Sequence, residues 1–264
     1  MSSAPKKPYI VEPSYFSNWA DLLFPKVANW LIPVALKIPG LTPNVVTLSS
    51  FLLYALGSIF LFADFPYHLL FSAILLPISY ILDCLDGQLA RVKGLSSPLG
   101  DYLDKTLDVF KIYILTLSLS LAMFIKTGEY WYFILGFTAC FGFNFRYYIK
   151  LETMFSMVSR DKDYLEKSRN LRYQLYEQLE VYYKGLSKSF LGLLKTFWLR
   201  NRILFFIDEV EFVVITSVAA IFNRLDIALW IFAIGHLSIA IFRLFERGYQ
   251  IDTNSKNLLR PIRK

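Results

Sequence analysis

Four aspartates are the most chemically distinctive residues of this sequence, because they recur at regular intervals on two apolar segments. The stretch DCLDGQLARVKGLSSPLGDYLDKTLD, residues 83–108, holds Asp83 and Asp86 near its start and Asp104 and Asp108 near its end. Each residue of an α-helix advances by about 100°, so each pair shares one face of its own helix. The link VKGLSSP is short, which predicts antiparallel neighbours with opposed acidic faces. We therefore expect the four carboxylates to meet in one cavity.

Such a cavity needs cations, because four unpaired carboxylates inside a membrane would be very costly. Mg²⁺ and Mn²⁺ prefer carboxylate oxygens and often share them with phosphate groups, and two such ions would offset the four charges. Gly87 and Ala90 lie on the face of the first aspartate pair, and Gly100 lies on the face of the second. Their small size leaves room for a substrate or for close helix approach. Arg91 follows at the mouth of the cavity and suits a phosphate.

These eight residues form the pattern D-x₂-D-G-x₂-A-R-x₈-G-x₃-D-x₃-D. The pattern resembles the signature of the CDP-alcohol phosphotransferase family at all eight positions. At residue frequencies of about 5–8%, eight such matches coincide on the order of once in 10¹⁰ positions, so the resemblance is specific. The stretch TPNVVT, residues 42–47, also looks like the start of the family's first helix.

The resemblance implies a reaction of phospholipid biosynthesis, in which an acceptor hydroxyl attacks the β-phosphate of a CDP-alcohol, CMP leaves and a phosphodiester forms. It implies Mg²⁺ or Mn²⁺ as cofactor, with two ions per site. It assigns metal binding to Asp83, Asp86, Asp104 and Asp108, the role of catalytic base also to Asp108, and the CDP site to Gly87, Ala90, Arg91 and Gly100. CDP-diacylglycerol is the donor that the family favours, CDP-choline and CDP-ethanolamine are alternatives, and the acceptor alcohol stays open. The resemblance also favours a homodimer.

Two other interpretations of the aspartates stay open. One is structural ion pairing with nearby cations, namely Arg91, Lys93 and Lys105. The other is an ion-coupled transporter, whose sites usually lie near the midplane on broken helices within inverted repeats. The sequence contains no internal repeat and no matching Gly/Pro breaks, which weakens the transporter interpretation.

The segments that must position these residues are those of an all-α integral membrane protein. Hydrophobic residues make up 55% of the chain and charged residues only 19%, whereas soluble domains average about 45–50% and about 25%. Six apolar segments are long enough, at about 20 residues or more, to cross a bilayer: residues 44–63, 67–91, 98–125, 130–148, 203–222 and 227–245. Within a single membrane domain, residues 1–264, we expect four spans over 44–158, a cytosolic helical insert at 159–202, and two spans over 203–246.

Residues 14–38 precede the first span and carry Trp, Phe and Leu with a few charges. They predict an amphipathic helix in the membrane interface, with a loop packed on the cytosolic face as the alternative. The N-terminal stretch MSSAPKKPYIVEPSYF lacks the apolar core of a signal peptide, so we expect it to belong to the mature protein.

Lysine and arginine gather on one side of the predicted topology. That side holds both termini, the turn between the aspartate pairs and the insert, so all of these are expected to face the cytosol. The same bias accounts for the formal net charge of +7, so we expect no nucleic acid as a partner. Cys84 and Cys140 lie inside apolar segments and predict neither a disulfide framework nor a metal finger.

Several further residues and segments have two possible roles each. Lys111 lies one turn beyond Asp108 and either supports that carboxylate or a bound anion, or is a locally paired or snorkelling lysine. Asp208, Glu209 and Glu211 either bind the acceptor or pair with Arg146, Arg202 or Arg243. The insert is either a solvated amphipathic surface or a lid or docking element. The small pairs Gly136/Cys140 and Ala139/Gly142 support helix packing and are weak signals of a dimer.

Overall fold

The structure, a computed structural model, describes residues 23–166 and 209–253, and these form helices without strands. The helices are α1 (Phe24–Ala35), α2 (Pro43–Ile59), α3 (His68–Lys93), α4 (Pro98–Thr127), α5 (Trp131–Arg160), α8 (Glu209–Ile221) and α9 (Leu225–Thr253). The predicted all-α class is confirmed, and α2 to α5, α8 and α9 lie where the six spans are expected. Most of the insert, residues 167–202, lies outside the described residues.

Three of the described helices are long and apolar enough to cross a membrane: His68–Lys93, Pro98–Thr127 and Leu225–Tyr249. Helix α2 is a shorter apolar helix. The number of six spans therefore stays a prediction. Helices α5 and α9 continue beyond their predicted apolar segments, to Arg160 and Thr253, because polar residues can extend a helix after the apolar run has ended.

Local signals in the sequence set the start and end of the helices around the aspartates. Thr42 caps α2 by accepting a hydrogen bond from the Val45 amide at 3.4 Å, and Ser97 caps α4 by accepting one from the Gly100 amide at 3.1 Å. A proline follows each cap at the first helical position, where its missing amide proton costs nothing. Gly94 ends α3 in the left-handed conformation, with a φ of 64°. The short turn makes α3 and α4 antiparallel, as the link predicts.

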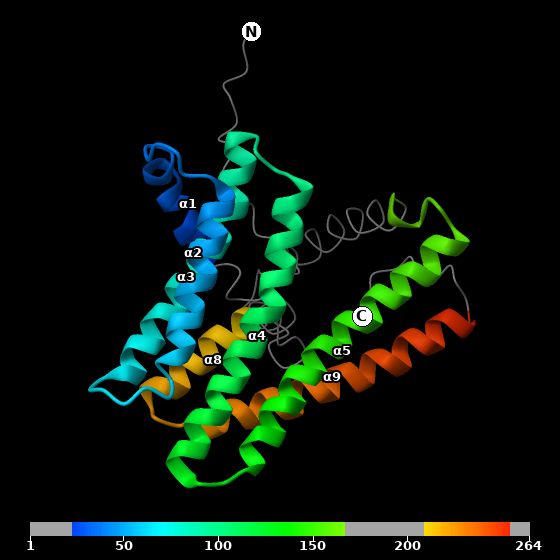
Figure 1. The fold of residues 1–264 in the computed structure, drawn as a ribbon. Coiled ribbons are helices and arrows are strands. Elements are labelled where there is room, and N and C mark those ends of the chain that lie inside the picture. Colours follow the sequence, from blue (N-terminus) through cyan, green and yellow to red (C-terminus); the bar gives the residue numbers. More distant parts are fainter. Residues whose placement is uncertain (1–22, 167–208, 254–264) are drawn as a thin grey trace, which may run out of the picture.

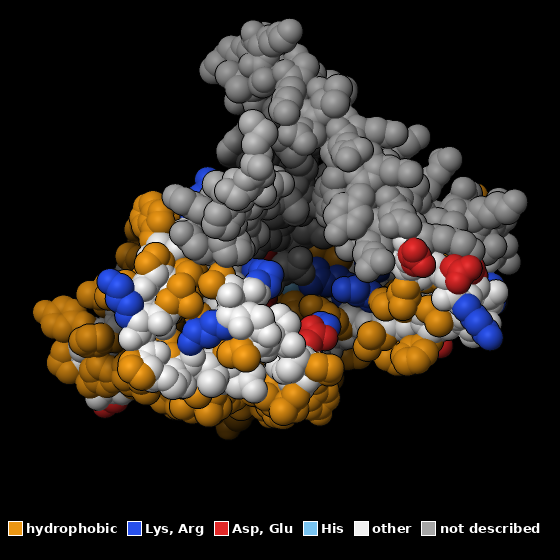
Figure 2. All heavy atoms as spheres, turned by 90° about the horizontal axis from the view of Figure 1, so that it is seen from above, with side chains coloured by type: hydrophobic (Ala, Val, Ile, Leu, Met, Phe, Trp, Pro, Cys, Tyr) orange, Lys and Arg blue, Asp and Glu red, His pale blue; other side chains and the backbone are white. Residues whose placement is uncertain are grey.

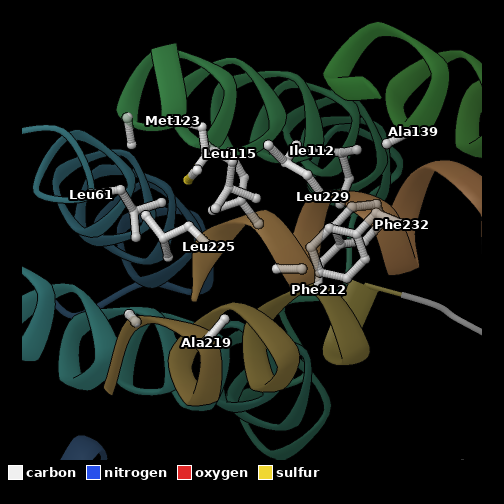
Figure 3. Close-up of a cluster of buried hydrophobic side chains, with 14 of the residues drawn as sticks. Leu61, Ile112, Leu115, Met123, Ala139, Phe212, Ala219, Leu225, Leu229 and Phe232 are labelled. Carbon is white, nitrogen blue, oxygen red and sulfur yellow. The ribbon is translucent and has the colours of Figure 1, made fainter. Parts of the chain in front are cut away.

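The main hydrophobic core lies between α2 to α5, α8 and α9. Figure 3 shows part of it, with Ile112 and Leu115 of α4 directed toward Phe212 of α8 and toward Leu229 and Phe232 of α9. Helix α5 packs along α9 and α2 packs along α3, which Figure 1 shows as two side-by-side pairs. This core fixes α3, α4 and α8 relative to one another, and these helices carry the acidic residues.

The outer surface of the helices is also apolar. Large hydrophobic side chains such as Leu52, Ile74, Phe110 and Phe137 are between 49% and 71% exposed. A contiguous apolar exterior on long helices is unfavourable in water and favourable against lipid tails. The chain is therefore an integral membrane protein.

The predicted interfacial segment 14–38 contains a helix, α1, as expected. Residues 14–22 of this segment lie outside the described part of the chain. The buried side of α1 is formed by Phe24, Ala28, Ile32 and Ala35, which pack mainly on α3. Its other side exposes Trp30 at 78% and Val34 at 59%. An exposed tryptophan on a short apolar helix fits the headgroup region, and the interfacial position stays a prediction.

Two glycines allow α5 to approach its neighbours closely. A Cβ added at Gly136 would lie 2.0 Å from Ser120 Oγ of α4, and one added at Gly142 would lie 2.7 Å from the backbone of His236 in α9. The small residues that were weak signals of a dimer are thus used for packing inside the chain. A homodimer remains a prediction from the family.

Candidate active site

A pocket of about 250 Å³ lies where α2 begins, α3 ends and α4 begins. Figure 2 looks onto this end of the bundle, where Lys and Arg side chains lie among polar groups and hydrophobic side chains surround them. The pocket is lined by Pro43, Asn44, Thr47, Asp86, Gly87, Ala90, Arg91, Leu95, Ser96, Ser97, Gly100, Asp101 and Asp104. All four residues predicted to contact CDP are among them, although they come from two helices.

Small side chains shape the wall of the pocket. A Cβ added at Gly100 would lie 3.3 Å from both Asn44 Oδ1 and Ser97 Oγ, which is tighter than ordinary contact. A Cβ added at Gly87 would lie 3.6 Å from Arg91 Nη1. The absence of a side chain at Gly87 therefore leaves space beside the Arg91 guanidinium. The absence of a side chain at Gly100 lets α4 approach the start of α2.

The four aspartates divide into two positions. One carboxylate oxygen from each of Asp83, Asp104 and Asp108 lies within 4.8 Å of the others. Asp86 is outside this group and lines the pocket, where its side chain is 6% exposed and its Oδ2 has no hydrogen-bond partner in the described part of the chain. Asp104 belongs both to the carboxylate group and to the pocket wall. It therefore connects the pocket to the group of three converging carboxylates.

This acidic group fits a metal ion by its chemistry. Three carboxylates whose oxygens converge are the donors that hard divalent cations prefer. Asp86, with a buried oxygen that lacks a partner, adds a fourth carboxylate one turn from Asp83. Asp83, Asp104 and Asp108 are thus placed where they could share a cation, and metal binding by all four aspartates stays a prediction.

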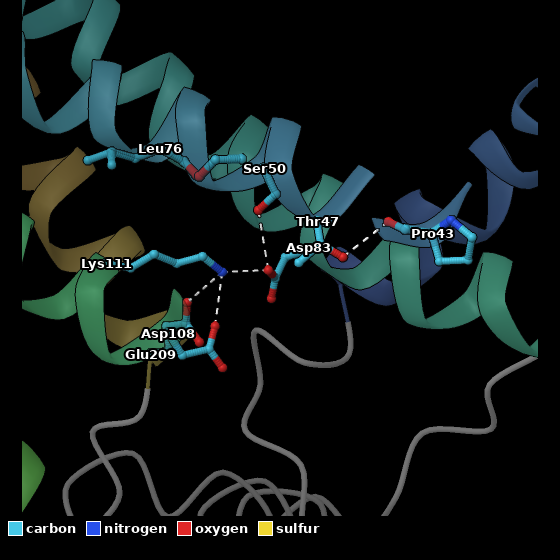
Figure 4. Close-up of polar contacts among 9 residues, drawn as sticks. Pro43, Thr47, Ser50, Leu76, Asp83, Asp108, Lys111 and Glu209 are labelled. Atoms are coloured by element: carbon cyan, nitrogen blue, oxygen red, sulfur yellow. Dashed lines mark hydrogen bonds and ion pairs between the residues drawn. The ribbon is translucent and has the colours of Figure 1, made fainter. Parts of the chain in front are cut away.

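A lysine also lies in the acidic group, as Figure 4 shows. Lys111 Nζ donates to Asp83 Oδ1 at 2.5 Å and to Asp108 Oδ1 at 3.0 Å, and it lies 3.3 Å from Glu209 Oε1. Asp83 Oδ1 also accepts a hydrogen bond from Ser50 Oγ of α2 at 3.2 Å. Lys111 is therefore a paired lysine that contacts Asp108, which unites the two interpretations given by the sequence.

Two of the cations named in the ion-pair interpretation, Lys105 and Lys93, have other partners in the structure. Lys105 pairs with exposed Asp101 at 2.6 Å, and Lys93 donates to the Leu41 carbonyl at 2.6 Å. Glu209 pairs with Lys111 rather than with an arginine named above. Asp208 and Arg202 lie outside the described residues.

Sequence reasoning missed the contribution of α2. Ser50 bonds Asp83, and Asn44 and Thr47 line the pocket. Their only signal is that polar residues recur at about one-turn spacing along the first apolar span. The stretch TPNVVT marks the start of that helix but does not show which of its faces meets α3.

The fold and site define the class of the protein, an all-helical integral membrane protein with a carboxylate-rich site at one end of the bundle. Residues 40–160 match the model of the CDP-alcohol phosphatidyltransferase family. The matched stretch contains the whole aspartate motif, residues 83–108.

Individual proteins are also similar to parts of the chain. The chain is 38% identical over 69 residues to archaetidylinositol phosphate synthase of Pyrococcus horikoshii, covering 26% of this chain and 35% of that protein. It is 32% identical over 142 residues to cholinephosphotransferase 1 of Gallus gallus, covering 49% and 41%. The chain spans about a third of the length of the first curated relatives it matches.

A solved structure shares the fold over most of both chains. It is Mycobacterium tuberculosis phosphatidylinositol phosphate synthase with CDP-DAG bound, at 19% sequence identity and a TM-score of 0.55. The similarity covers 86% of this chain and 94% of that chain. It supports the helical architecture into which the motif is built.

Proposed function

We propose that this protein is a metal-dependent CDP-alcohol phosphotransferase. The observation that carries the proposal is the continuity of the site: a pocket lined by Gly87, Ala90, Arg91 and Gly100 leads through Asp104 to the carboxylates of Asp83 and Asp108. A nucleotide in the pocket would place its diphosphate beside the acidic group. No observation on the described residues favours a transporter, since α3 and α4 run unbroken through the aspartates.

The pocket offers a phosphate several favourable interactions. Helices α2 and α4 both begin at its wall, and the first amides of a helix attract anions. Arg91 adds a guanidinium, whose planar fork matches phosphate oxygens. These positive groups lie at the outer part of the site and the carboxylates lie deeper, so a diphosphate would be held at the boundary between them.

The residues assigned to the metal are Asp83, Asp86, Asp104 and Asp108, and the ion is Mg²⁺ or Mn²⁺, with two ions offsetting four negative charges. Such ions, when bound, neutralise charge on a diphosphate and on its leaving group. Asp108 is assigned as the base that accepts the proton of the acceptor hydroxyl. The hydroxyl oxygen then bonds to the β-phosphorus, and the bond between that phosphorus and the bridging oxygen breaks to release CMP.

CDP-diacylglycerol is the proposed donor, and the acceptor is an alcohol whose identity the motif does not encode. The solved structure of similar fold has CDP-DAG bound, whereas cholinephosphotransferase 1 of Gallus gallus is also similar to part of this chain. The site is proposed to face the cytosol together with both termini, because Lys and Arg gather at this end of the bundle. A homodimer in the lipid membrane completes the proposal.

The experiment that tests this function measures CMP release by the purified full chain. Mg²⁺ or Mn²⁺ is supplied, CDP-diacylglycerol, CDP-choline and CDP-ethanolamine are offered separately, and candidate acceptor alcohols are pooled. Release that requires both the metal and an acceptor is expected with one donor, and dividing the pool identifies the acceptor. No metal-dependent release with any donor, combined with no metal-dependent binding of CDP, would overturn the proposed function.

The substitution Arg91→Met is expected to weaken CDP binding by about tenfold, because a charged hydrogen bond contributes about 1.5 kcal/mol or more. Titration calorimetry with CDP measures the change. Lys37→Met is the matched control, since Lys37 is an exposed cation after α1 and is not part of the pocket wall. Equal losses in both variants would show that net charge rather than a contact in the pocket attracts the nucleotide.

A further inference from the structure

A buried ammonium group lies among the carboxylates assigned to the metal, which is an unusual arrangement for a cation site. Lys111 is 2% exposed, and its Nζ contacts carboxylates from three helices: Asp83 of α3, Asp108 of α4 and Glu209 of α8. Two of these three carboxylates also belong to the group whose oxygens converge within 4.8 Å. The lysine therefore occupies positions around the ligands that a metal ion also needs.

The charge of Lys111 works against metal binding unless it is balanced. An ammonium within hydrogen-bond distance of Asp83 and Asp108 repels a divalent cation and competes with it for the same oxygens. Partial burial makes this repulsion stronger than in water. A site with four aspartates and one uncompensated lysine would therefore bind two divalent ions more weakly than one without the lysine.

Glu209 supplies the missing negative charge. Its carboxylate lies 3.3 Å from Lys111 Nζ and is 16% exposed, and it is not one of the three grouped metal-ligand candidates. With Glu209 included, the net charge of the group returns to that of the four aspartates alone. In Figure 4 Lys111 lies between Asp83 on one side and Asp108 and Glu209 on the other.

We propose that Lys111 and Glu209 form a charge-neutral pair, in which Lys111 is the counter-ion of the Asp83 and Asp108 carboxylates in the metal-free protein and Glu209 cancels its charge when the metal binds. This inference rests on the proposed function only in that Asp83 and Asp108 bind the metal. The pair also anchors the first residue of α8 to the centre of α3 and α4. It gives α8, which contributes no residue to the motif, a direct effect on metal affinity.

The proposal predicts that the two single substitutions affect the affinity for Mn²⁺ differently. Glu209→Gln leaves the lysine uncompensated, so the dissociation constant for Mn²⁺ is expected to rise by at least tenfold. Lys111→Met removes the competing cation, so the dissociation constant is expected to stay the same or fall, while the metal-free protein melts at a lower temperature because its acidic group has lost a counter-ion. The double variant is expected to bind Mn²⁺ within about threefold of the unmodified protein.

The measurement uses the purified full chain in detergent and Mn²⁺ as the probe. Affinity is obtained from the electron paramagnetic resonance signal of free Mn²⁺, and melting temperature is followed with and without the ion. Arg224 and Asp226 provide a control pair at the opposite end of the bundle, joined at 2.9 Å. The variants Arg224→Met, Asp226→Asn and their combination are expected to leave the affinity for Mn²⁺ unchanged.

The outcomes separate the inference from the proposed function. If both single substitutions weaken Mn²⁺ binding and the double variant weakens it further, the pair only supports packing and the inference is wrong. If Glu209→Gln weakens Mn²⁺ binding, Lys111→Met does not and no donor yields CMP, the pair is confirmed and the proposed reaction is wrong. If the unmodified protein does not bind Mn²⁺, both proposals are overturned.

Discussion

Replacing Asp108 by Asn is expected to abolish CMP release, with a loss of at least about 10²–10⁴-fold, the range that general acid–base catalysis contributes. The amide keeps the shape of the side chain but can neither accept the proton of the acceptor hydroxyl nor offer an anionic oxygen to a metal. Asp108 is one of the three carboxylates whose oxygens converge, so both functions are lost together. The rate of CMP release at saturating donor and Mn²⁺ measures the effect.

The control for this experiment is Asp64→Asn, an equal change at an exposed aspartate between α2 and α3, away from the pocket. It is expected to retain full activity. In the Asp108 variant Lys111 keeps its contacts with Asp83 and Glu209, so a folded protein with an unchanged melting transition is expected. Substantial metal-dependent activity in Asp108→Asn would contradict the assignment of the base and would move this role to another carboxylate.

Replacing Gly142 by Ala is expected to lower the stability of the bundle by about 1–3 kcal/mol, the cost typical of overpacking. The added Cβ would lie 2.7 Å from both the carbonyl carbon of His236 and the amide nitrogen of Leu237. These are backbone atoms and cannot rotate away, so α5 and α9 would have to separate. The melting temperature of the purified protein in detergent is expected to fall by several degrees.

Gly248→Ala is the matched control on α9. Among the described residues, no atom beyond the chain neighbours and the helix's own backbone lies within 4 Å of a Cβ added there. Alanine favours a helix over glycine by about 1 kcal/mol. This variant is expected to be as stable as the unmodified protein or slightly more stable. If both substitutions gave the same change in melting temperature, close packing of α5 on α9 would not be what requires glycine at position 142.

Gly136→Ala is expected to lower the stability of the bundle by less than Gly142→Ala and by more than Gly248→Ala. Its added Cβ would meet Ser120 Oγ at 2.0 Å and the Thr116 carbonyl at 3.0 Å. The hydroxyl can rotate away, although it would lose its hydrogen bonds to the Thr116 and Tyr132 carbonyls. The difference between the two glycines follows from what each faces, which the sequence pattern does not show.

The sequence alone determined which residues could form the site and which helices carry them. Helical periodicity places Asp83 and Asp86 on one face and Asp104 and Asp108 on another, and a short link forces these faces together. Caps such as Thr42 and Ser97 and the left-handed Gly94 mark where the helices begin and end. These are local properties, which depend on neighbouring residues only.

Only the tertiary structure decided how the site is divided and what completes it. It groups Asp83 with Asp104 and Asp108 but leaves Asp86 on the pocket wall, and it brings Glu209 to Lys111 from a distant part of the chain. Periodicity fixes which face of a helix a side chain occupies, but not how far neighbouring helices are rotated or shifted relative to each other. Those offsets are set by packing at α2, α5 and α8, where side chains from distant segments must fit together.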